Sequence, residues 1–371
     1  MALRRLSVFA VLSAVVVSLY RGALGDYPND AARAVDALAG GHLLRALTVR
    51  PQPLMGPVSV VVRAPFAAIA HALGGGDLVA YRAGAIPCLV AAGLLAVWLL
   101  RVFPARRPVM GLLVVLLAVG SPAAVNALDV GHPEEVLAAA LTVAGVVAAM
   151  RSRTVAAAVL LGLALATKQW AVIALPPAML AVGRPKWRLA AGAVGLAALL
   201  TVPQAIADPH GFASMSRHAA TATNDVFVQS WWSLVAHTLP GWLAQLTHPA
   251  IVLAAVPVTI LAARRGVRAD GVLPLLALLF LIRCVFDPVD NFYYHLPLLL
   301  ALLAWDLQTR RTLPWATLGA TLCLVETNSF LAGTQASVFY FVWTAILGAT
   351  LAGARVRLSR ASTRAGLQAP A

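Results

Sequence analysis

Apolar runs of about 14 to 24 residues recur along the whole chain, and only short polar segments separate them. An α-helix satisfies its own backbone hydrogen bonds, so runs of this length can cross a lipid bilayer as helices. The composition points the same way, because 61% of the residues are hydrophobic and only 11% are charged. In soluble domains the apolar share is about 45 to 50%. The sequence therefore predicts an all-α, polytopic membrane protein and excludes an ordinary soluble domain.

The runs predict about twelve transmembrane helices in a single domain over residues 1–354, with both termini in the cytoplasm. The predicted spans are 6–24, 78–101, 108–127, 134–150, 154–167, 170–183, 188–206, 245–263, 271–285, 292–305, 313–326 and 335–353. Residues 355–371 are rich in arginine and are predicted to form a disordered cytoplasmic tail. The net charge of +14 is explained by basic cytoplasmic loops, so no nucleic-acid partner is expected.

Two extracytoplasmic segments are predicted, a first loop over residues 25–77 and a second over residues 207–244. Within the first loop, residues 56–73 are apolar but contain Arg63 and His71. This segment is therefore predicted to be a helix that lies along the outer membrane interface.

The predicted spans 154–167 and 170–183 are unusually short. Fourteen residues reach about 21 Å as a helix, whereas the hydrocarbon core is about 30 Å thick. The tip between them contains Lys168. We therefore expect Lys168 to lie below the outer surface, inside the protein, as in the interrupted helices that surround binding sites.

Two carboxylates, Asp26 and Asp30, follow the first predicted span directly. A carboxylate at the rim of a membrane is costly unless it faces water, a partner or a substrate, so both are candidate functional residues. Asp30 has a second interpretation, because aspartate is a favourable N-cap and a helical stretch over residues 31–39 follows it. The sequence leaves both interpretations open.

Further polar residues gather on the outer face of the predicted topology. Of the 14 acidic residues, only Asp270 and Asp306 fall on the cytoplasmic side. Acids contribute little to membrane orientation, so their position outside needs another reason. We expect distant segments to converge there in a site made of Asp26, Asp30, His132, Glu134, Glu135, Lys168, Arg283, Asp287, Asp290, Asn291, Tyr294 and His295.

This set of side chains suits the transfer of a sugar from a lipid carrier. Fixed cations such as Lys168 and Arg283 can bind an anionic head group, and a carboxylate can accept the proton of an attacking alcohol. Structural interpretations exist for some of them. Glu134 and Glu135 fit the first turn of a helix, where the dipole favours acids, and Arg283 and Asp287 fit an i, i+4 ion pair.

The three cysteines, Cys88, Cys284 and Cys323, are far apart and show no metal-binding spacing, so they are expected to be thiols in the core. No metal site and no cofactor is predicted. Carboxylates near a phosphate would nevertheless accommodate a divalent cation.

The order of elements resembles the GT-C superfamily of membrane glycosyltransferases that use polyprenyl-phosphate sugars, especially the bacterial mannosyltransferases that use polyprenyl-phosphate mannose. Asp26 resembles the catalytic aspartate after the first span of these enzymes. The helix that starts after Pro53-Leu54, ends at Gly74-Gly75-Gly76 and precedes Tyr81-Arg82 resembles their juxtamembrane helices. Ala166-Thr167-Lys168 resembles the segment carrying their phosphate-binding lysine. The family often has a tyrosine a few residues after its aspartate, whereas here Tyr27 follows at once.

The resemblance implies transfer of mannose or a similar sugar from a polyprenyl-phosphate donor to a hydroxyl of a lipid or glycan acceptor, with inversion, outside the bacterial plasma membrane. It implies that Asp26 is the base, with Asp30 as the alternative. It also implies that Lys168, Arg283 and His295 bind the phosphate and that the sugar hydroxyls contact Glu134, Glu135, Asp287, Asp290 and Asn291. His132 and Tyr294 complete the predicted substrate-binding set.

Two other classes of protein fit parts of the pattern. A secondary transporter or lipid flippase would also use interrupted helices and charges in the membrane. However, no internal repeat of the spans is visible, and the ionisable groups lie at one face. In a non-catalytic assembly subunit, the outer loops would be a docking surface. The sequence assigns no oligomeric state.

Overall fold

The structure, a computed structural model, describes residues 3–104, 108–182, 186–221, 223–309 and 313–367, with backbone alone at residues 108, 220 and 355–367. Within this part, every regular element is a helix, and one isolated β-bridge joins Asp225 to Thr238. The all-α class predicted from the apolar runs is therefore confirmed.

The longer helices differ in length and are named in chain order. They are α1 (Leu3–Tyr20), α2 (Arg33–Ala39), α3 (Leu43–Thr48), α4 (Pro57–Ala72), α5 (Asp77–Val102), α6 (Pro108–Gly120), α7 (Pro122–Asp129), α8 (Pro133–Met150), α9 (Thr154–Leu165), α10 (Leu175–Ala181), α11 (Lys186–Ala207), α12 (Pro209–Ala220), α13 (Gly241–Arg264), α14 (Val272–Phe286), α15 (Leu296–Thr309), α16 (Trp315–Ser329) and α17 (Gly333–Leu367). Short π or 3-10 turns join some of them: η1 (Pro28–Ala32), η2 (Gln169–Ala174), η3 (Trp231–Leu234), η4 (Ala269–Gly271) and η5 (Phe292–His295).

Many of these helices can cross a bilayer. Among the described residues, 8 are long and apolar enough to do so: Leu3–Tyr20, Asp77–Val102, Val109–Asp129, Pro133–Met150, Lys186–Ala207, Gly241–Arg264, Ala269–Phe286 and Gly333–Ala354. Shorter apolar helices cover Pro57–Ala72, Thr154–Leu165 and Gln169–Ala181. The multi-pass membrane class is thus confirmed, while the predicted number of about twelve crossings stays a prediction.

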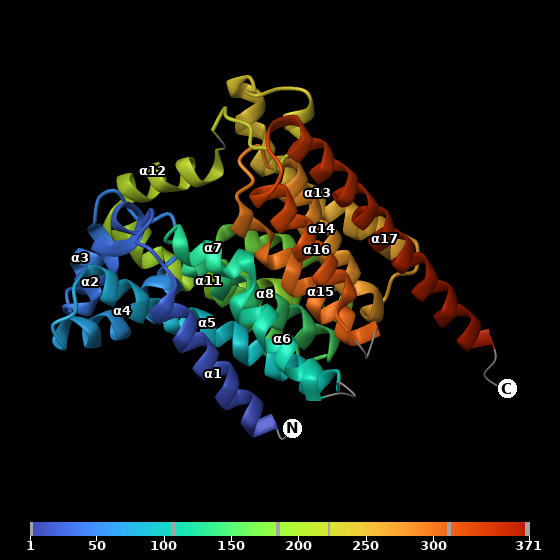
Figure 1. The fold of residues 1–371 in the computed structure, drawn as a ribbon, viewed down its shortest axis with the longest axis horizontal. Coiled ribbons are helices and arrows are strands. Elements are labelled where there is room, and N and C mark those ends of the chain that lie inside the picture. The colour runs from blue at the N-terminus through green and yellow to red at the C-terminus, as the bar shows by residue number, and fades with distance from the viewer. Residues whose placement is uncertain (1–2, 105–107, 183–185, 222, 310–312, 368–371) are drawn as a thin grey trace.

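Helix α8 lies at the centre of the molecule, where it packs against α5, α9 and α15 (Figure 1). Within it, 83% of the residues are buried. Its sequence is rich in alanine and valine and contains Gly145, and small side chains such as alanine and glycine allow neighbouring helices to approach closely in lipid. As a consequence, Glu134 and Glu135 in its first turn lie in the protein interior instead of facing water.

The segment predicted as the first extracytoplasmic loop contains helices α2, α3 and α4, which gather at one end of the molecule (Figure 1). The helix expected over residues 56–73 is present as α4, and it packs on α2 and α5. Its Arg63 is completely buried and does not face the membrane interface. The reason is an inward partner, since the Arg63 Nη1 atom lies 3.4 Å from Oε2 of Glu134.

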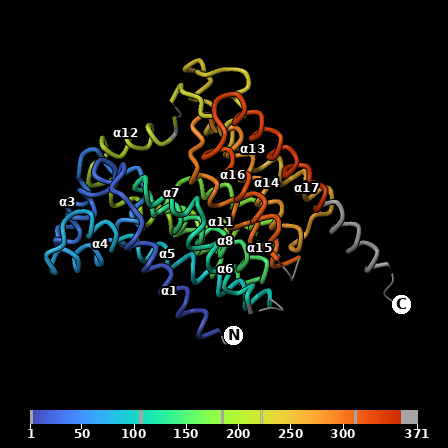
Figure 2. Tube along the Cα trace, viewed as in Figure 1, coloured from blue at the N-terminus to red at the C-terminus, as the bar shows by residue number. Residues whose placement is uncertain are grey.

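Both ends of the described chain run toward one side of the molecule. The N- and C-terminal ends lie toward the lower edge of Figures 1 and 2, whereas the loop between α12 and α13 lies at the upper edge. Helix α17 continues to Leu367, so the backbone of most of the predicted tail, residues 355–371, is helical. Alanine, leucine and arginine, which favour helices, are frequent in that segment. Residues 368–371 lie outside the described part.

Candidate functional site

A cluster of buried charges surrounds the start of α8. The Nζ atom of Lys168 lies 3.2 Å from Oε1 of Glu134 and 3.1 Å from Oε1 of Glu135. The Lys168 side chain is 13% exposed, and both glutamates are buried. An ammonium group at such a depth requires compensation, and the two carboxylates supply it. The structure thus brings together three residues that the sequence placed on the same outer face.

Lys168 lies where the backbone leaves the helical conformation. Helix α9 ends at Leu165, and Lys168 itself is extended, with φ −146° and ψ 130°, before η2 begins. The start of α4 secures this segment, because the Gly56 N–H donates to the Thr167 carbonyl at 2.9 Å. Lys168 is therefore largely shielded from solvent, as the shortness of the two predicted spans indicated, whereas its neighbour Gln169 is exposed.

His132 connects this cluster to the two aspartates after the first span. Its Nδ1 atom lies 3.0 Å from Oε1 of Glu134. Its Nε2 atom lies 3.5 Å from Oδ2 of Asp26 and 3.8 Å from Oδ2 of Asp30. Both ring nitrogens therefore face carboxylates, an arrangement that suits the imidazolium form, in which both nitrogens are donors.

Local environments shift the pKa values of this group. Burial raises the pKa of Asp30, the charge of His132 opposes that shift, and Asp26 adds to it. Burial lowers the pKa of His132, but the hydrogen bond to Glu134 and the charge of Glu134 outweigh it, so the net pKa is raised. A carboxylate with a raised pKa is a stronger proton acceptor when it is ionised.

The two aspartates differ in their exposure to solvent. The Asp26 side chain is 68% exposed and that of Asp30 is 21% exposed. The N-cap interpretation of Asp30 is wrong, because Asp30 lies inside η1 and the N-cap of α2 is Ala32. The chain continues from η1 into α2 without a break, so no helix starts directly after Asp30.

A close backbone contact holds Asp26 beside His132. Gly25 has φ +48°, and its neighbour Asp26 donates its N–H to the Val130 carbonyl at 3.0 Å. A Cβ atom at position 25 would lie 2.3 Å from the carbonyl carbon of Val130. Only glycine avoids this overlap, so the turn before Asp26 and the turn before His132 fit together through Gly25.

We expect Gly25→Ala to disrupt the contact between the turn before Asp26 and the turn before His132. The control is Gly41→Ala, because Gly41 also has a positive φ of +79° but no atom lies within 4 Å of its added Cβ. The control should lose only about 1 to 3 kcal/mol of stability, the cost of holding alanine in the left-handed backbone conformation. Gly25→Ala should lose more stability in thermal unfolding and also lose activity. Equal unfolding of the two variants would contradict the close contact.

A cavity of about 470 Å³ lies beside the charge cluster, between η2, α13 and α14. Among its lining residues are two cations, two acids and two aromatic side chains: Lys168, Arg283, Glu135, Asp287, Trp170 and Tyr294. The Arg283 guanidinium carbon lies 4.6 Å from the Tyr294 ring centroid and 5.2 Å from that of Trp170. The cavity wall therefore presents charges of both signs beside two aromatic rings.

The acids of this cavity have partners other than Arg283. Trp170 Nε1 donates to Oε2 of Glu135 at 2.9 Å, and Nε2 of His248 lies 3.2 Å from Oδ2 of Asp287. The intrahelical ion pair considered for Arg283 and Asp287 is therefore wrong. Within the described part of the chain, no carboxylate lies within 4.0 Å of Arg283, which donates instead to the Tyr294 carbonyl at 3.1 Å.

Seven residues of the predicted site do not line this cavity: Asp26, Asp30, His132, Glu134, Asp290, Asn291 and His295. The first four belong to the charge cluster around the start of α8. Asp290 and His295 are completely buried on the far side of the cavity wall, where they contact each other, and Asn291 is the N-cap of η5. Cys284 and His295 directly follow Arg283 and Tyr294 in sequence and point away from the cavity. All candidate residues of this segment were predicted to belong to one site, whereas Arg283, Val289 and Tyr294 line the cavity and the residue that follows each of them does not.

Comparison with known families identifies the chain. The model of glycosyltransferase family 87 matches residues 54–288, which is more than half of the sequence. This chain belongs to glycosyltransferase family 87. No curated protein matches it. The matched region of this family 87 member contains the charge cluster at α8 and Arg283, whereas Asp26 precedes the match and His295 follows it.

Membership in family 87 and the apolar helices together define a multi-pass membrane glycosyltransferase. The family supports a transferase over the transporter and the non-catalytic subunit that the sequence had left as alternatives. The GT-C-like architecture expected from the resemblance is also supported.

Trp170, His248 and Arg63 contact the site, although they were not predicted as site residues. His248 and Arg63 lie within apolar runs, where an ionisable residue is a functional candidate by default. That signal was present in the sequence. Trp170 gave no comparable signal, because aromatic residues in apolar runs are common at membrane interfaces.

Proposed function

We propose that this family 87 enzyme transfers a sugar, mannose or a related hexose, from a polyprenyl-phosphate donor to a hydroxyl of a lipid or polysaccharide acceptor. The observation that carries the proposal is the cavity wall. Lys168 and Arg283 come from distant segments and reach the same cavity, and among the described residues no carboxylate lies within 4.0 Å of Arg283. Two fixed cations in a partly desolvated cavity favour a ligand with an anionic head group.

The apolar surroundings of the cavity favour a lipid carrier over a soluble sugar phosphate. A second cavity of about 400 Å³ shares Ile251 with the first and is lined mainly by apolar side chains, among them Trp232, Leu246 and Phe286. Residues of α13 line both cavities. A phosphate bound at Lys168 and Arg283 would leave its prenyl chain next to this apolar surface.

The proposed base is Asp26, with Asp30 as the second carboxylate that can replace it. Asp26 is open to an acceptor from solvent, and His132 contacts both aspartates. In the transfer, the acceptor oxygen bonds to the anomeric carbon while the bond from that carbon to the phosphate oxygen breaks. The hydroxyl proton passes to Asp26, and the polyprenyl phosphate leaves as an anion held by Lys168 and Arg283. A single displacement of this kind inverts the anomeric carbon.

Glu135, Asp287 and Tyr294 line the same cavity and are proposed to contact sugar hydroxyls. Glu134 contacts Lys168, Arg63 and His132, and its proposed part is to orient these cations. We propose no cofactor for the transfer itself.

The assay that tests this function uses membranes containing the full chain, radiolabelled polyprenyl-phosphate mannose and an acceptor extract. Label should enter the acceptor, and Asp26→Asn should abolish most of that transfer. The control is Asp77→Asn, since Asp77 is an exposed residue in the first turn of α5. Equally fast transfer by Asp26→Asn and Asp77→Asn would rule out Asp26 as the base. If the parent enzyme transferred no label, the proposed donor would be wrong.

We also propose that the site faces the outside of a bacterial plasma membrane, with both termini in the cytoplasm. In a Cys323→Ser background, His42→Cys should react with a membrane-impermeant thiol reagent in intact cells. Lys186→Cys should react only after the membrane is opened. Both positions are exposed, and the remaining natural cysteines, Cys88 and Cys284, are buried. The opposite labelling pattern would contradict the orientation.

A further inference from the structure

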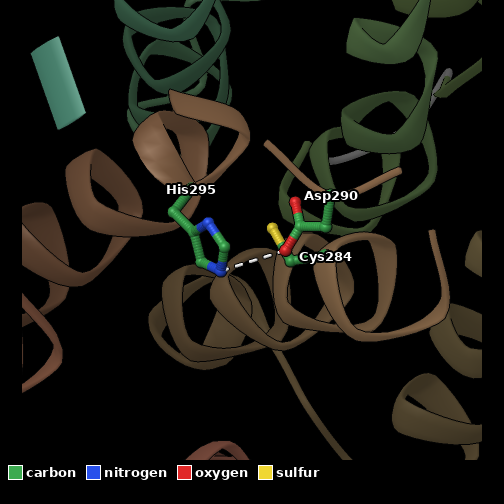
Figure 3. A group of neighbouring side chains, drawn as sticks. All are labelled: Cys284, Asp290 and His295. Atoms are coloured by element: carbon green, nitrogen blue, oxygen red, sulfur yellow. Dashed lines mark ion pairs between the residues drawn. The ribbon is translucent and has the colours of Figure 1, made fainter. Parts of the chain in front are cut away.

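Behind the cavity wall lies a second cluster of reactive side chains, Cys284, Asp290 and His295 (Figure 3). Cys284 belongs to α14, Asp290 to the loop that follows it, and His295 to η5. All three are completely buried. The Sγ atom, a carboxylate oxygen and an imidazole nitrogen lie within 4.8 Å of one another. Cys284 was expected to be a thiol in an apolar core, and the structure places it instead beside two metal-ligating side chains.

The hydrogen bonds around His295 define which nitrogen faces this cluster. Its Nδ1 atom lies 3.3 Å from the Phe292 carbonyl, which can only accept, so the ring proton belongs on Nδ1. The Nε2 atom then carries a lone pair, and it points at Oδ2 of Asp290 at 3.2 Å. Metal-binding histidines typically have one nitrogen fixed in this way by a backbone carbonyl.

With Asp290 in its carboxylate form, the cluster has more acceptors than donors, because the Cys284 thiol donates elsewhere, to the Tyr294 carbonyl at 3.5 Å. The Tyr340 hydroxyl lies 3.0 Å from both Oδ2 of Asp290 and Nε2 of His295, but it can donate only one hydrogen bond. Among the described residues, nothing hydrogen-bonds Oδ1 of Asp290, which is also buried. A buried carboxylate oxygen without a partner is costly. A cation at the centre of the cluster would satisfy these acceptors together.

The donor set selects the kind of cation. A thiolate, a carboxylate and a neutral imidazole carry two negative charges, which a divalent ion neutralises. Sulfur, nitrogen and oxygen donors together suit zinc, which prefers four ligands in a tetrahedron. With metal–ligand distances of 2.0 to 2.3 Å, neighbouring ligands lie roughly 3.3 to 3.8 Å apart. The separation between Asp290 and His295 is already close to this value, and since no ligand pair is more than 4.8 Å apart, Cys284 needs to approach by at most about 1 Å.

We propose that Cys284, Asp290 and His295 bind a zinc-class divalent ion, with the Tyr340 hydroxyl next to the fourth position. The site is closed to solvent, so its role is structural. It joins α14, η5 and α17, and two of its ligands directly follow Arg283 and Tyr294. The ion therefore fixes the wall on which these two cavity residues are presented. This inference does not depend on the identity of the sugar donor.

Metal analysis of the purified full-length protein in detergent tests the proposal. The parent protein should contain about one zinc ion per chain, and Cys284→Ser should lose most of it. The matched controls are Cys88→Ser and Cys323→Ser, which remove the other two thiols and should keep the ion. Asp290→Asn provides a second variant if Cys284→Ser does not fold.

Replacement of the ion by Co²⁺ gives an independent readout. The parent protein should show a thiolate-to-cobalt absorption band, and this band should disappear in Cys284→Ser and persist in Cys88→Ser. The proposal would be overturned if the parent protein contained no metal above the detergent blank and took up neither zinc nor cobalt. The three side chains would then form only a hydrogen-bonded cluster. Retention of the ion by both Cys284→Ser and Asp290→Asn would also overturn it.

Discussion

Replacing Lys168 with alanine is expected to slow sugar transfer by about 10²- to 10³-fold, the usual effect of removing one fixed donor to a developing negative charge. The departing phosphate becomes more anionic as the bond to the sugar breaks, and Lys168 is one of the two cations on the cavity wall. Lys168→Arg keeps the charge and should retain part of the activity. The measurement is the transfer rate over a range of donor concentrations.

The chain provides a matched control for this variant, since its second lysine, Lys186, is exposed at the start of α11. Lys186→Ala should leave the transfer rate unchanged. Equal rates for Lys168→Ala and the parent enzyme at every donor concentration would show that Lys168 does not contact the phosphate. The stability of each variant should be measured in parallel, because Lys168 also compensates Glu134 and Glu135.

The largest expected effect on stability belongs to Glu134→Ala, which should lower the free energy of unfolding by about 3 to 5 kcal/mol. Glu134 contacts three cationic groups, those of Arg63, His132 and Lys168. Arg63 is completely buried, and its Nε and Nη2 atoms have no hydrogen-bond partner among the described residues. Removal of the carboxylate would leave this guanidinium without a counter-charge in the interior.

Thermal unfolding in detergent measures this effect, and Glu326→Ala is its control because Glu326 is only half-buried and lies in α16. The double variant Arg63→Met with Glu134→Gln should be less destabilised than the sum of its single changes, since it removes both charges together. Unfolding temperatures that match between Glu134→Ala and Glu326→Ala would contradict the buried ion pair.

Much of the fold was predictable because membrane helices must satisfy their own backbone, which makes apolar run length a direct signal. The apolar run before Lys168 is too short to cross the bilayer, which predicted that this lysine lies inside the protein. Its side chain is 13% exposed in the structure. The partner of Arg63 was not predictable in the same way. Its position in α4 was clear, but which face of that helix is buried depends on packing against α5 and on a glutamate far along the chain.

The candidate site was predicted as a set of residues, but its division into two clusters was not. Lys168, Glu134 and Glu135 do meet, which was expected because all three were predicted to lie on the same side of the membrane. Arg283 faces the cavity and its neighbour Cys284 faces away. That separation follows from the direction of each side chain on α14 and η5, which the order of residues alone does not determine.

The central claim is that the cavity between η2, α13 and α14 holds a lipid-borne phosphate. An experimental structure of the enzyme with a bound polyprenyl phosphate tests it most directly. We predict that the phosphate oxygens lie within hydrogen-bond distance of the Lys168 ammonium and the Arg283 guanidinium, with the prenyl chain leading toward α13. A phosphate bound elsewhere, with Lys168 and Arg283 both left without contact to it, would contradict the claim.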